Sequence, residues 1–444
     1  MSEGGLGPAA AACLFPPLGA LVEGAGGVVL FARDSQSPDQ LAELTASLRA
    51  ERPGLLIAVD EEGGDVTRLE ARNGSSFPGN LALGAVDDVA LTRRVAAAIG
   101  GELAACGVNF DLAPVADVIV DPASAIVGIR SFGTDPALVS RHAAAFVDGL
   151  QSAGVAACAK HFPGHGESVA DSHLGLPSVE TDLETLRARA LPPFAAAVDA
   201  GVRAVMTAHV RFSAIDDEAA TLSAKTIGLL RSELGFDGLV ITDALEMRAI
   251  SGTVGLEGGA VRALAAGADA LCFGADVAPE QVESVRKAIV GGVPEARLLE
   301  AAARVAETAA WASSPKAHRD REAGAEAARR ALRVEGDVSL SGEPLFVELR
   351  PEATIAAGEA QHGLGGIEVR EGEQLPPLED LGRVVIVVRD AHRHAWQREL
   401  VTAGTVVVET GVPEWRPPAA RGWISTYGAG RVNLEAAAEL LRRR

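Results

Sequence analysis

The stretch GLVITDAL at residues 238–245 is a continuously apolar run that ends in a carboxylate, Asp243. Such a run is typical of a strand covered on both faces, because a strand with one face in water alternates apolar and polar residues. Six similar runs, separated by segments of helical periodicity, lie between residues 26 and 275: GGVVLF (26–31), LLIAVD (55–60), VNFDLAPV (108–115), VAACAKHF (155–162), RAVMTAHV (203–210) and ADALCFG (268–274).

Seven such units, with a weaker eighth strand near residues 11–15, predict an α/β fold of the TIM type, a (β/α)8-like barrel. A doubly wound parallel sheet is the alternative that this pattern leaves open. Four polar side chains stand at or just past the carboxyl ends of the runs: Asp60, His161, His209 and Asp243. Because those ends form the active face of a β/α barrel, we expect the four side chains to share one site.

Beyond Trp311 the pattern changes to a polar, helix-prone stretch and then to a second set of apolar runs: LFVEL (345–349), VVIVVRD (384–390), TVVVET (405–410) and WISTYG (423–428). These runs predict a small second α/β domain. We expect a barrel domain over residues 1–315, a linker over 316–335 and a C-terminal α/β domain of unknown role over 336–444.

The composition excludes several classes of protein. The 444 residues, 48% of them hydrophobic, suffice for roughly two to four domains. A net charge of −20 opposes binding to nucleic acid or to an anionic membrane surface. No apolar run reaches the roughly 18 residues of a membrane span and the start, MSEGGLG, lacks basic residues, so we expect a cytoplasmic location. Four separated cysteines without a CxxC motif indicate neither disulfides nor structural zinc.

The densest group of reactive side chains is KHFPGHG (160–166), followed by Asp171 and His173. Proline and glycine interrupt the group, which predicts a loop leaving a strand. It is a structural loop, a metal site built from the three histidines and Asp171, or an acid/base pair in which Asp171 fixes the tautomer of His173 and raises its pKa. Lys160 disfavours the metal site, because it places a cation beside the metal.

Two other segments carry candidate site residues. VDEEGGDVTR (59–68) has three acids before a glycine pair, which suits either a solvated turn or hydrogen bonds from substrate hydroxyls. Arg130, in the glycine-bounded loop GIRSFG (128–133), is a ligand contact or a surface cation. Asp243 is placed as a barrel would present a nucleophile or metal ligand, although an aspartate there also caps the following helix well.

IAVDEEGGDVTR, IVGIRSFG, KHFPGHG with DSH close behind, MTAHV and GLVITDALEM follow one another in an order that resembles glycoside hydrolase family three. The similarity is to its bacterial β-N-acetylglucosaminidase branch, the enzymes of peptidoglycan recycling, and covers roughly residues 26–275. KHFPGHG with DSH is highly specific to that branch. The resemblance implies a β/α barrel and a retaining exo-β-N-acetylglucosaminidase, which removes terminal N-acetylglucosamine from muropeptides or chitin-type oligosaccharides without a cofactor or a metal.

The resemblance also implies residue roles. Asp243 is the expected nucleophile, and His173 with its partner Asp171 is the expected acid/base. Substrate-binding roles fall on Asp60, Arg68, Arg130, Lys160, His161 and His209. The expected partner is an N-acetylglucosamine-containing saccharide, bound by a monomer or a small homo-oligomer.

Three other functions remain open. A β-N-acetylglucosaminide phosphorylase would use the same residues, because a histidine acid/base does not repel an incoming phosphate as a carboxylate would. A metal-dependent hydrolase and a catalytically silent sugar-binding protein are the others.

The chain departs from the family pattern at two positions. Members commonly carry Arg where Asp65 stands and Asp where Ala244 stands. Asp65 puts an anion near the expected sugar pocket, but neither change touches the expected nucleophile or acid/base. The C-terminal segment resembles a shortened form of the second domain of longer members.

Overall fold

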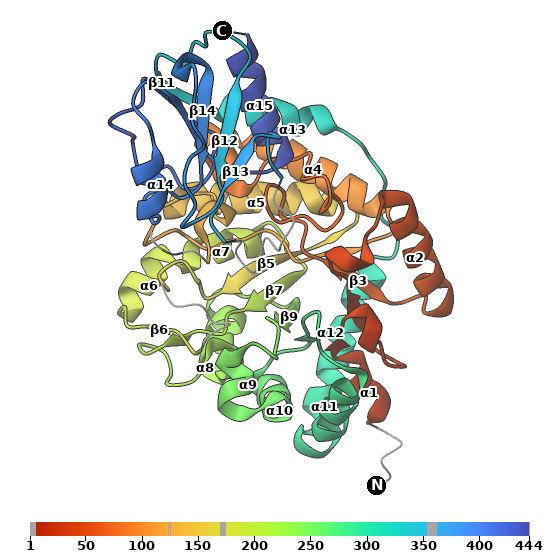
Figure 1. Ribbon diagram of the computed structural model, residues 1–444. Coiled ribbons are helices and arrows are strands. Elements are labelled where there is room, and N and C mark those ends of the chain that lie inside the picture. Colours follow the sequence, from red (N-terminus) through yellow and green to blue (C-terminus); the bar gives the residue numbers. More distant parts are fainter. Residues whose placement is uncertain (1–5, 123, 125, 169–174, 353–361, 444) are drawn as a thin grey trace.

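The computed structural model describes residues 6–122, 124, 126–168, 175–352 and 362–443. Its larger part is a barrel of short parallel strands with helices around it (Figure 1). The barrel strands are β1 (Leu14–Phe15), β2 (Gly27–Val29), β3 (Leu56–Val59), β4 (Phe110–Asp111), β5 (Ala156–Phe162), β7 (Ala204–Thr207), β9 (Leu239–Thr242) and β10 (Leu271–Cys272).

Backbone hydrogen bonds close these strands into a ring. Strands β2, β3, β4, β5, β7 and β9 form one parallel sheet, and β1 pairs with β10. The amide of Val29 donates to the carbonyl of Pro16 over 2.9 Å, which joins β1 to β2. The amide of Thr242 donates to the carbonyl of Ala270 over 3.0 Å, which joins β9 to β10. The predicted barrel-type α/β fold is therefore confirmed, and the weak strand candidate near residues 11–15 is β1.

The barrel strands are apolar throughout because both of their faces are buried. In β3, Leu56 and Ala58 belong to the core inside the barrel, whereas Ile57 and Val59 belong to the core between strands and helices. All four side chains are almost completely inaccessible to solvent. This two-sided burial explains why the sequence shows continuous apolar runs instead of alternation.

The barrel helices are α1 (Gly7–Ala12), α2 (Pro38–Glu51), α3 (Asn80–Val86), α4 (Val89–Ala105), α5 (Pro136–Ser152), α6 (Leu183–Arg189), α7 (Leu191–Asp199), α8 (Ala224–Gly228), α9 (Arg248–Val254), α10 (Leu256–Ala266), α11 (Pro279–Gly292) and α12 (Glu295–Trp311). Two short strands, β6 (Ser178–Val179) and β8 (Arg211–Phe212), pair with each other outside the ring. In the part of the chain that the structure describes, no helix is both long and apolar enough to cross a membrane.

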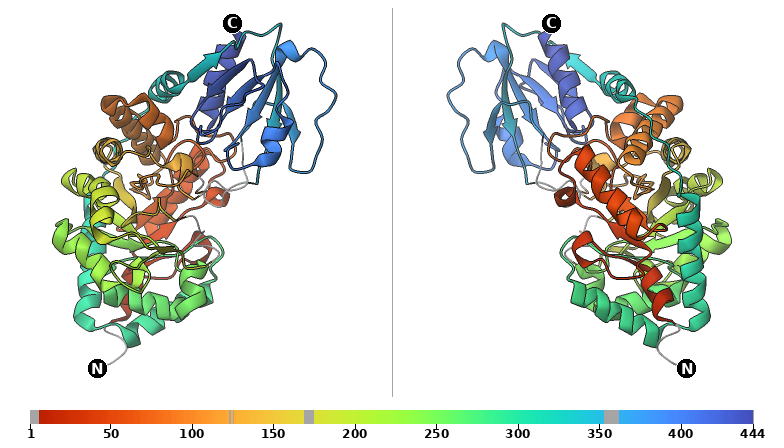
Figure 2. Two further views of the ribbon diagram at one scale, coloured as in Figure 1. Left: turned by 90° about the vertical axis from the view of Figure 1, so that its left-hand side faces the viewer. Right: turned by 90° about the vertical axis from the view of Figure 1, so that its right-hand side faces the viewer.

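The C-terminal part is a six-stranded sheet in the order β11-β16-β15-β14-β12-β13, parallel except for the antiparallel pair β11 and β16. Figure 2 shows this part, mostly in blue, beside the barrel. Helix α15 (Arg431–Arg442) packs on one face of this sheet and α14 (Ala395–Leu400) on the other. The strands are β11 (Arg333–Gly336), β12 (Leu345–Leu349), β13 (Ile367–Val369), β14 (Val384–Val388), β15 (Val406–Glu409) and β16 (Gly422–Ser425).

Residues 316–335, the range expected for a linker, contain helix α13 (Arg321–Ala331) and the first three residues of β11. Helix α13 packs against α3 and α4 of the barrel and also against α15. Its buried residues are small, which permits this close packing on two sides: Ala323, Gly324, Ala327, Ala328 and Ala331.

The C-terminal sheet is joined to the loop that follows β3 by a buried ion pair. Asp65 Oδ2 lies 2.5 Å from a guanidinium nitrogen of Arg389, at the end of β14, and Asp65 Oδ1 accepts a hydrogen bond from the amide of Ala429 over 2.9 Å. Gly64 and Gly430 approach closely here, since a Cβ on Gly430 would lie 2.8 Å from the Cα of Gly64. Two side chains far apart in the sequence therefore hold the two parts of the chain together.

We predict that the Asp65–Arg389 pair stabilises this contact as a coupled unit. Each single variant, Asp65→Asn or Arg389→Gln, leaves one buried charge without its partner, whereas the double variant removes both charges. Equilibrium urea denaturation of the two single variants and the double variant is expected to give a coupling free energy of about 1–3 kcal/mol.

The matched control is the same cycle on Arg187 and Glu233, an exposed barrel pair, for which about 0–1 kcal/mol is expected. Equal coupling energies in the two cycles contradict the prediction.

Candidate active site

The carboxyl ends of four barrel strands present the polar side chains that the sequence singled out. Asp60 follows β3, Lys160 and His161 lie near the end of β5, and Asp243 follows β9. His209 lies two residues past β7. The structure thus brings the candidates together at one end of the barrel, since the same ends of neighbouring parallel strands lie side by side.

A buried network of ion pairs connects the ends of β3 and β5. The ammonium group of Lys160, which is 1% exposed, donates to Asp60 Oδ1 over 2.6 Å and contacts Glu62 Oε1 at 2.7 Å. Arg130 forms a bidentate pair with Glu62, with distances of 2.7 and 2.9 Å. A guanidinium nitrogen of Arg68 lies 3.7 Å from Asp60 Oδ2. Three cations therefore surround two carboxylates.

The network keeps Lys160 and Glu62 charged although they are buried. Burial alone would lower the pKa of Lys160, but Asp60 and Glu62 raise it above its ordinary value. Burial likewise opposes ionisation of Glu62, yet Arg130 and Lys160 hold the pKa of that carboxyl far below its usual range. The side chains are thus fixed donors and acceptors over the physiological range of pH.

Glu61 fixes the loop that follows β3 through its buried carboxylate. Its carboxylate accepts hydrogen bonds from the amides of Arg68 and Leu69, at 2.8 and 3.0 Å, and its own amide donates to Asp111 over 2.9 Å. Burial raises the pKa of Glu61 to about 7. These contacts fix the backbone from which the Arg68 side chain extends.

Asp243 is an ionised carboxylate. Burial would raise its pKa, but its interactions with His161, His209, the Ala244 amide and Lys160 lower it to about 2. That amide donates to Asp243 Oδ1 over 2.8 Å. The site therefore favours the carboxylate form of Asp243, which is the form that can act as a nucleophile.

His209 is fully buried, and both of its ring nitrogens have partners. Nδ1 lies 2.8 Å from the hydroxyl of Thr221, and Nε2 lies 3.0 Å from the carbonyl oxygen of Ala244. Ala244 contacts His209 through its carbonyl oxygen and Asp243 through its amide, so the side chain at position 244 takes part in neither contact. The geometry makes His209 a residue that positions the segment carrying Asp243.

Asp117 organises the loop that follows β5. Its carboxylate pairs with His161 Nδ1 over 2.7 Å and accepts the amides of His161 and His165 over 3.2 and 2.6 Å. The ring of His165 lies edge-on to that of His161, with 5.9 Å between centroids. Pairing of Nδ1 with Asp117 orients the His161 ring and leaves Nε2 as its other hydrogen-bonding atom.

Glu62 and Asp117 are the partners that sequence reasoning missed as site residues. Glu62 stands among the acids of the segment 59–68, but nothing in its position shows that it would bind Lys160 and Arg130. Asp117 lies two residues past the run that ends at Val115, so a search for polar side chains just past the ends of the runs could have found it.

Asp171 and His173 lie outside the described residues, as does the remainder of 169–174. Where the structure describes the chain, no three His, Cys, Asp or Glu side chains form a group that could hold a metal ion.

Comparison with known proteins identifies the family. The sequence model of the glycosyl hydrolase family 3 N-terminal domain matches residues 21–308. A β-hexosaminidase of Nitrosomonas eutropha is 39% identical over 272 residues, which cover 59% of this chain and 77% of that protein. A β-hexosaminidase of Alkalilimnicola ehrlichii is 43% identical over 251 residues, covering 55% and 72%.

Solved structures are also similar, and one of them covers the second sheet as well as the barrel. A glycoside hydrolase family 3 β-N-acetylglucosaminidase from Paenibacillus sp. FPU-7 is 30% identical, with a TM-score of 0.85 over 99% of this chain and 96% of that one. NagZ from Neisseria gonorrhoeae, solved with N-trifluoroacetyl-D-glucosamine, is 32% identical, with a TM-score of 0.59 over 70% and 90%. This chain belongs to glycosyl hydrolase family 3 and is a glycoside hydrolase.

Proposed function

We propose that this enzyme is a retaining exo-β-N-acetylglucosaminidase, which removes terminal β-linked N-acetylglucosamine from saccharides. The observation that carries the proposal is the position of the Asp243 carboxylate directly after β9, at the end of the barrel where β5 presents Lys160 and His161. The curated relatives compared above bear the name β-hexosaminidase, and the Neisseria structure holds an N-acylated glucosamine.

In the proposed reaction Asp243 attacks the anomeric carbon and displaces the leaving oxygen, which gives a covalent glycosyl-enzyme. His173, paired with Asp171, protonates the leaving oxygen. The same imidazole then takes a proton from water as the water attacks the anomeric carbon and releases Asp243. The assignment of His173 and Asp171 rests on the resemblance of KHFPGHG and DSH to the family.

The ion network supplies the proposed contacts to the sugar. Asp60 is partly exposed and offers carboxylate oxygens to hydroxyl donors, while Arg68 and Arg130 offer N–H donors to hydroxyl oxygens. Lys160 and His161 complete this set, and His209 acts by positioning the main chain after Asp243. Fixed donors and acceptors discriminate among sugars, because an analogue that lacks a hydroxyl or amide leaves one of them unpaired.

The function is tested with an aryl β-N-acetylglucosaminide and the matching aryl β-glucoside. We expect kcat/KM to be about 10²-fold or more higher for the acetamido sugar, because binding groups for the acetamido substituent stay unpaired with the glucoside. Addition of EDTA is expected to leave the rate unchanged, and phosphate buffer is expected to yield free sugar. Preference for the glucoside contradicts the proposal, inactivation by EDTA indicates a metal-dependent hydrolase, and a sugar 1-phosphate product indicates a phosphorylase.

Asp243→Asn is expected to abolish turnover while N-acetylglucosamine still binds. An amide is a very poor nucleophile, so kcat should fall by about 10³-fold or more. Hydrolysis of the aryl substrate and isothermal titration with the free sugar measure the two effects. The matched control is Asp237→Asn, which changes an exposed aspartate before the same strand. An undiminished kcat in Asp243→Asn rejects the assignment of Asp243 as the nucleophile.

His173→Ala is expected to slow hydrolysis according to the leaving group. An activated nitrophenolate departs without protonation, whereas an alkyl alkoxide needs a proton, so the alkyl glycoside should lose about 10²- to 10⁴-fold in kcat/KM and the nitrophenyl glycoside much less. The exposed His318→Ala is the control and should leave the ratio of the two rates unchanged. Equal losses for both substrates in His173→Ala argue against an acid role.

A further inference from the structure

The loop after β5 leads to the acid/base residues of the proposed reaction. Its first described part runs from Pro163 to Ser168, and Asp171 and His173 follow Ser168 by three and five residues in the sequence. Each freely rotating residue between a rigid base and a catalytic group adds two soft dihedral angles. The contacts that fix Ser168 and its neighbours therefore bear on how precisely His173 can meet the leaving oxygen.

The loop after β4 supports this segment along its length. Three hydrogen bonds join the two loops in the same order along both: the His165 amide to the Asp117 carboxylate over 2.6 Å, the Val120 amide to the Gly166 carbonyl over 3.1 Å, and the Ser124 hydroxyl to the Ser168 carbonyl over 2.8 Å. A Cβ on Gly166 would lie 1.7 Å from the carbonyl oxygen of Val118. The two main chains are therefore in direct contact.

The Ser124 hydroxyl makes the contact that is nearest in sequence to the acid/base residues. Ser124 and Ser168 are each 3% exposed, so the hydrogen bond between them is shielded from water. Solvent cannot readily replace a buried hydroxyl donor once its side chain is removed. Ser124 therefore restrains the point from which the chain continues toward His173.

Glu167 ties the same segment to a second element of the barrel. One of its carboxylate oxygens accepts a hydrogen bond from the hydroxyl of Thr181. The other accepts from the guanidinium group of Arg189, the last residue of α6, over 2.5 Å. Hydrogen bonds between two charged groups are among the stronger ones in proteins. The segment is thus held both by the loop after β4 and by α6.

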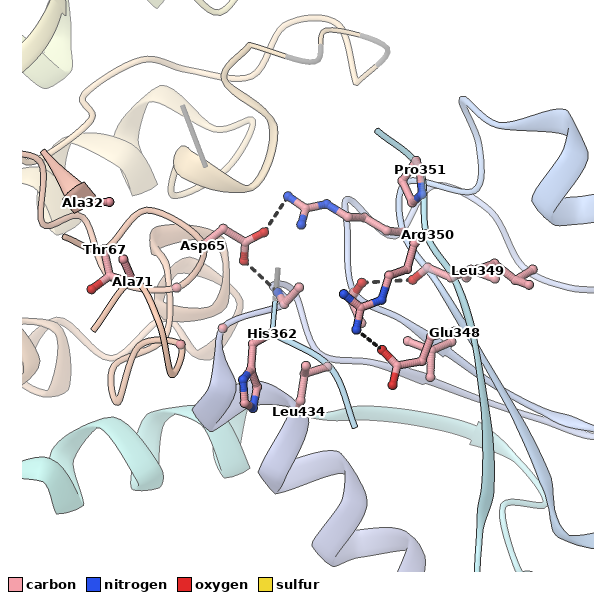
Figure 3. A pocket seen from close by; sticks show the side chains of 18 of the residues that line it. Ala32, Asp65, Thr67, Ala71, Glu348, Leu349, Arg350, Pro351, His362 and Leu434 are labelled. Carbon is pink, nitrogen blue, oxygen red and sulfur yellow. Dashed lines mark hydrogen bonds and ion pairs between the residues drawn. The ribbon is translucent and has the colours of Figure 1, made fainter. Parts of the chain in front are cut away.

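The loop after β4 is itself anchored to the C-terminal sheet. His392, in the turn after β14, donates from Nε2 to the carbonyl of Pro122 over 2.8 Å. The same turn carries Arg389, whose ion pair with Asp65 is shown in Figure 3. The C-terminal sheet therefore reaches the supporting loop two residues before Ser124.

We propose that Ser124 and Glu167 are positioning residues for proton transfer, which hold segment 163–168 so that His173 meets the leaving oxygen in a productive geometry. The inference rests on the proposed glycosidase function and adds two residues that act through the acid/base. Loss of either side chain should slow protonation of the leaving oxygen and leave the attack by Asp243 largely unaffected.

Alkyl and nitrophenyl β-N-acetylglucosaminides test the proposal. The ratio of their kcat/KM values does not depend on how much of the protein is folded, so it separates lost proton transfer from lost stability. In Ser124→Ala and in Glu167→Ala the alkyl glycoside is expected to lose about tenfold more in kcat/KM than the nitrophenyl glycoside, because a displaced acid loses part of its effect. Glu167 is 28% exposed, so its variant decides the question even if Ser124→Ala does not fold.

Two matched controls remove similar contacts elsewhere in the barrel. Ser140→Ala deletes a hydroxyl that donates to the carbonyl of Pro136 in α5. Glu233→Ala deletes a carboxylate that pairs with Arg187 of α6. Both variants should leave the ratio of the two kcat/KM values unchanged.

A second background shows whether the two side chains act through His173. In His173→Ala there is no imidazole to position, so adding Ser124→Ala or Glu167→Ala is expected to change the ratio no further. An unchanged ratio in a single variant, or a further fall in the His173→Ala background, overturns the inference for that side chain. If the wild type hydrolyses neither glycoside, or if His173→Ala alone leaves the ratio unchanged, the proposed function fails together with the inference.

Discussion

The buried ammonium group of Lys160 is the constraint around which the active end of the barrel is built. A lone charge at 1% exposure is very costly, so the fold must bring anions to it. Asp60 and Glu62 meet that requirement from the loop after β3, and Arg130 then balances Glu62 from the loop after β4. Strand β5 and the loops after β3 and β4 are thereby fixed relative to one another. Although Asp243 is buried, His161 and His209, the Ala244 amide and Lys160 favour its carboxylate form.

Much of the fold could be predicted from the sequence, because each strand and helix leaves a pattern in its own stretch of residues. Strands buried on both faces gave continuous apolar runs, and the polar residues at their ends marked the active face. What the sequence could not reveal are pairings between distant segments. Nothing local shows that Glu62 meets Lys160, that Asp117 holds the loop of His161, or that β11 runs antiparallel beside β16. These contacts depend on how strands are ordered in space, and each member reads alone as an ordinary polar residue or a short extended segment.

The two departures from the family pattern have different physical explanations. At position 244 the contacts are made by the main chain. Its amide donates to Asp243 and its carbonyl oxygen contacts His209, whatever side chain is present. At position 65 the side chain itself is used, and its partner, Arg389, lies more than 300 residues later in the C-terminal sheet. An anion that looked misplaced beside a sugar pocket is therefore part of the contact between the two halves of the molecule.

This contact limits how the halves can be recombined. A barrel from a relative that carries arginine at the position of Asp65 would set two guanidinium groups against each other if it were fused to this C-terminal sheet. Hybrid enzymes assembled across this boundary should therefore contain a mismatch unless the residues at positions 65 and 389 are transferred together.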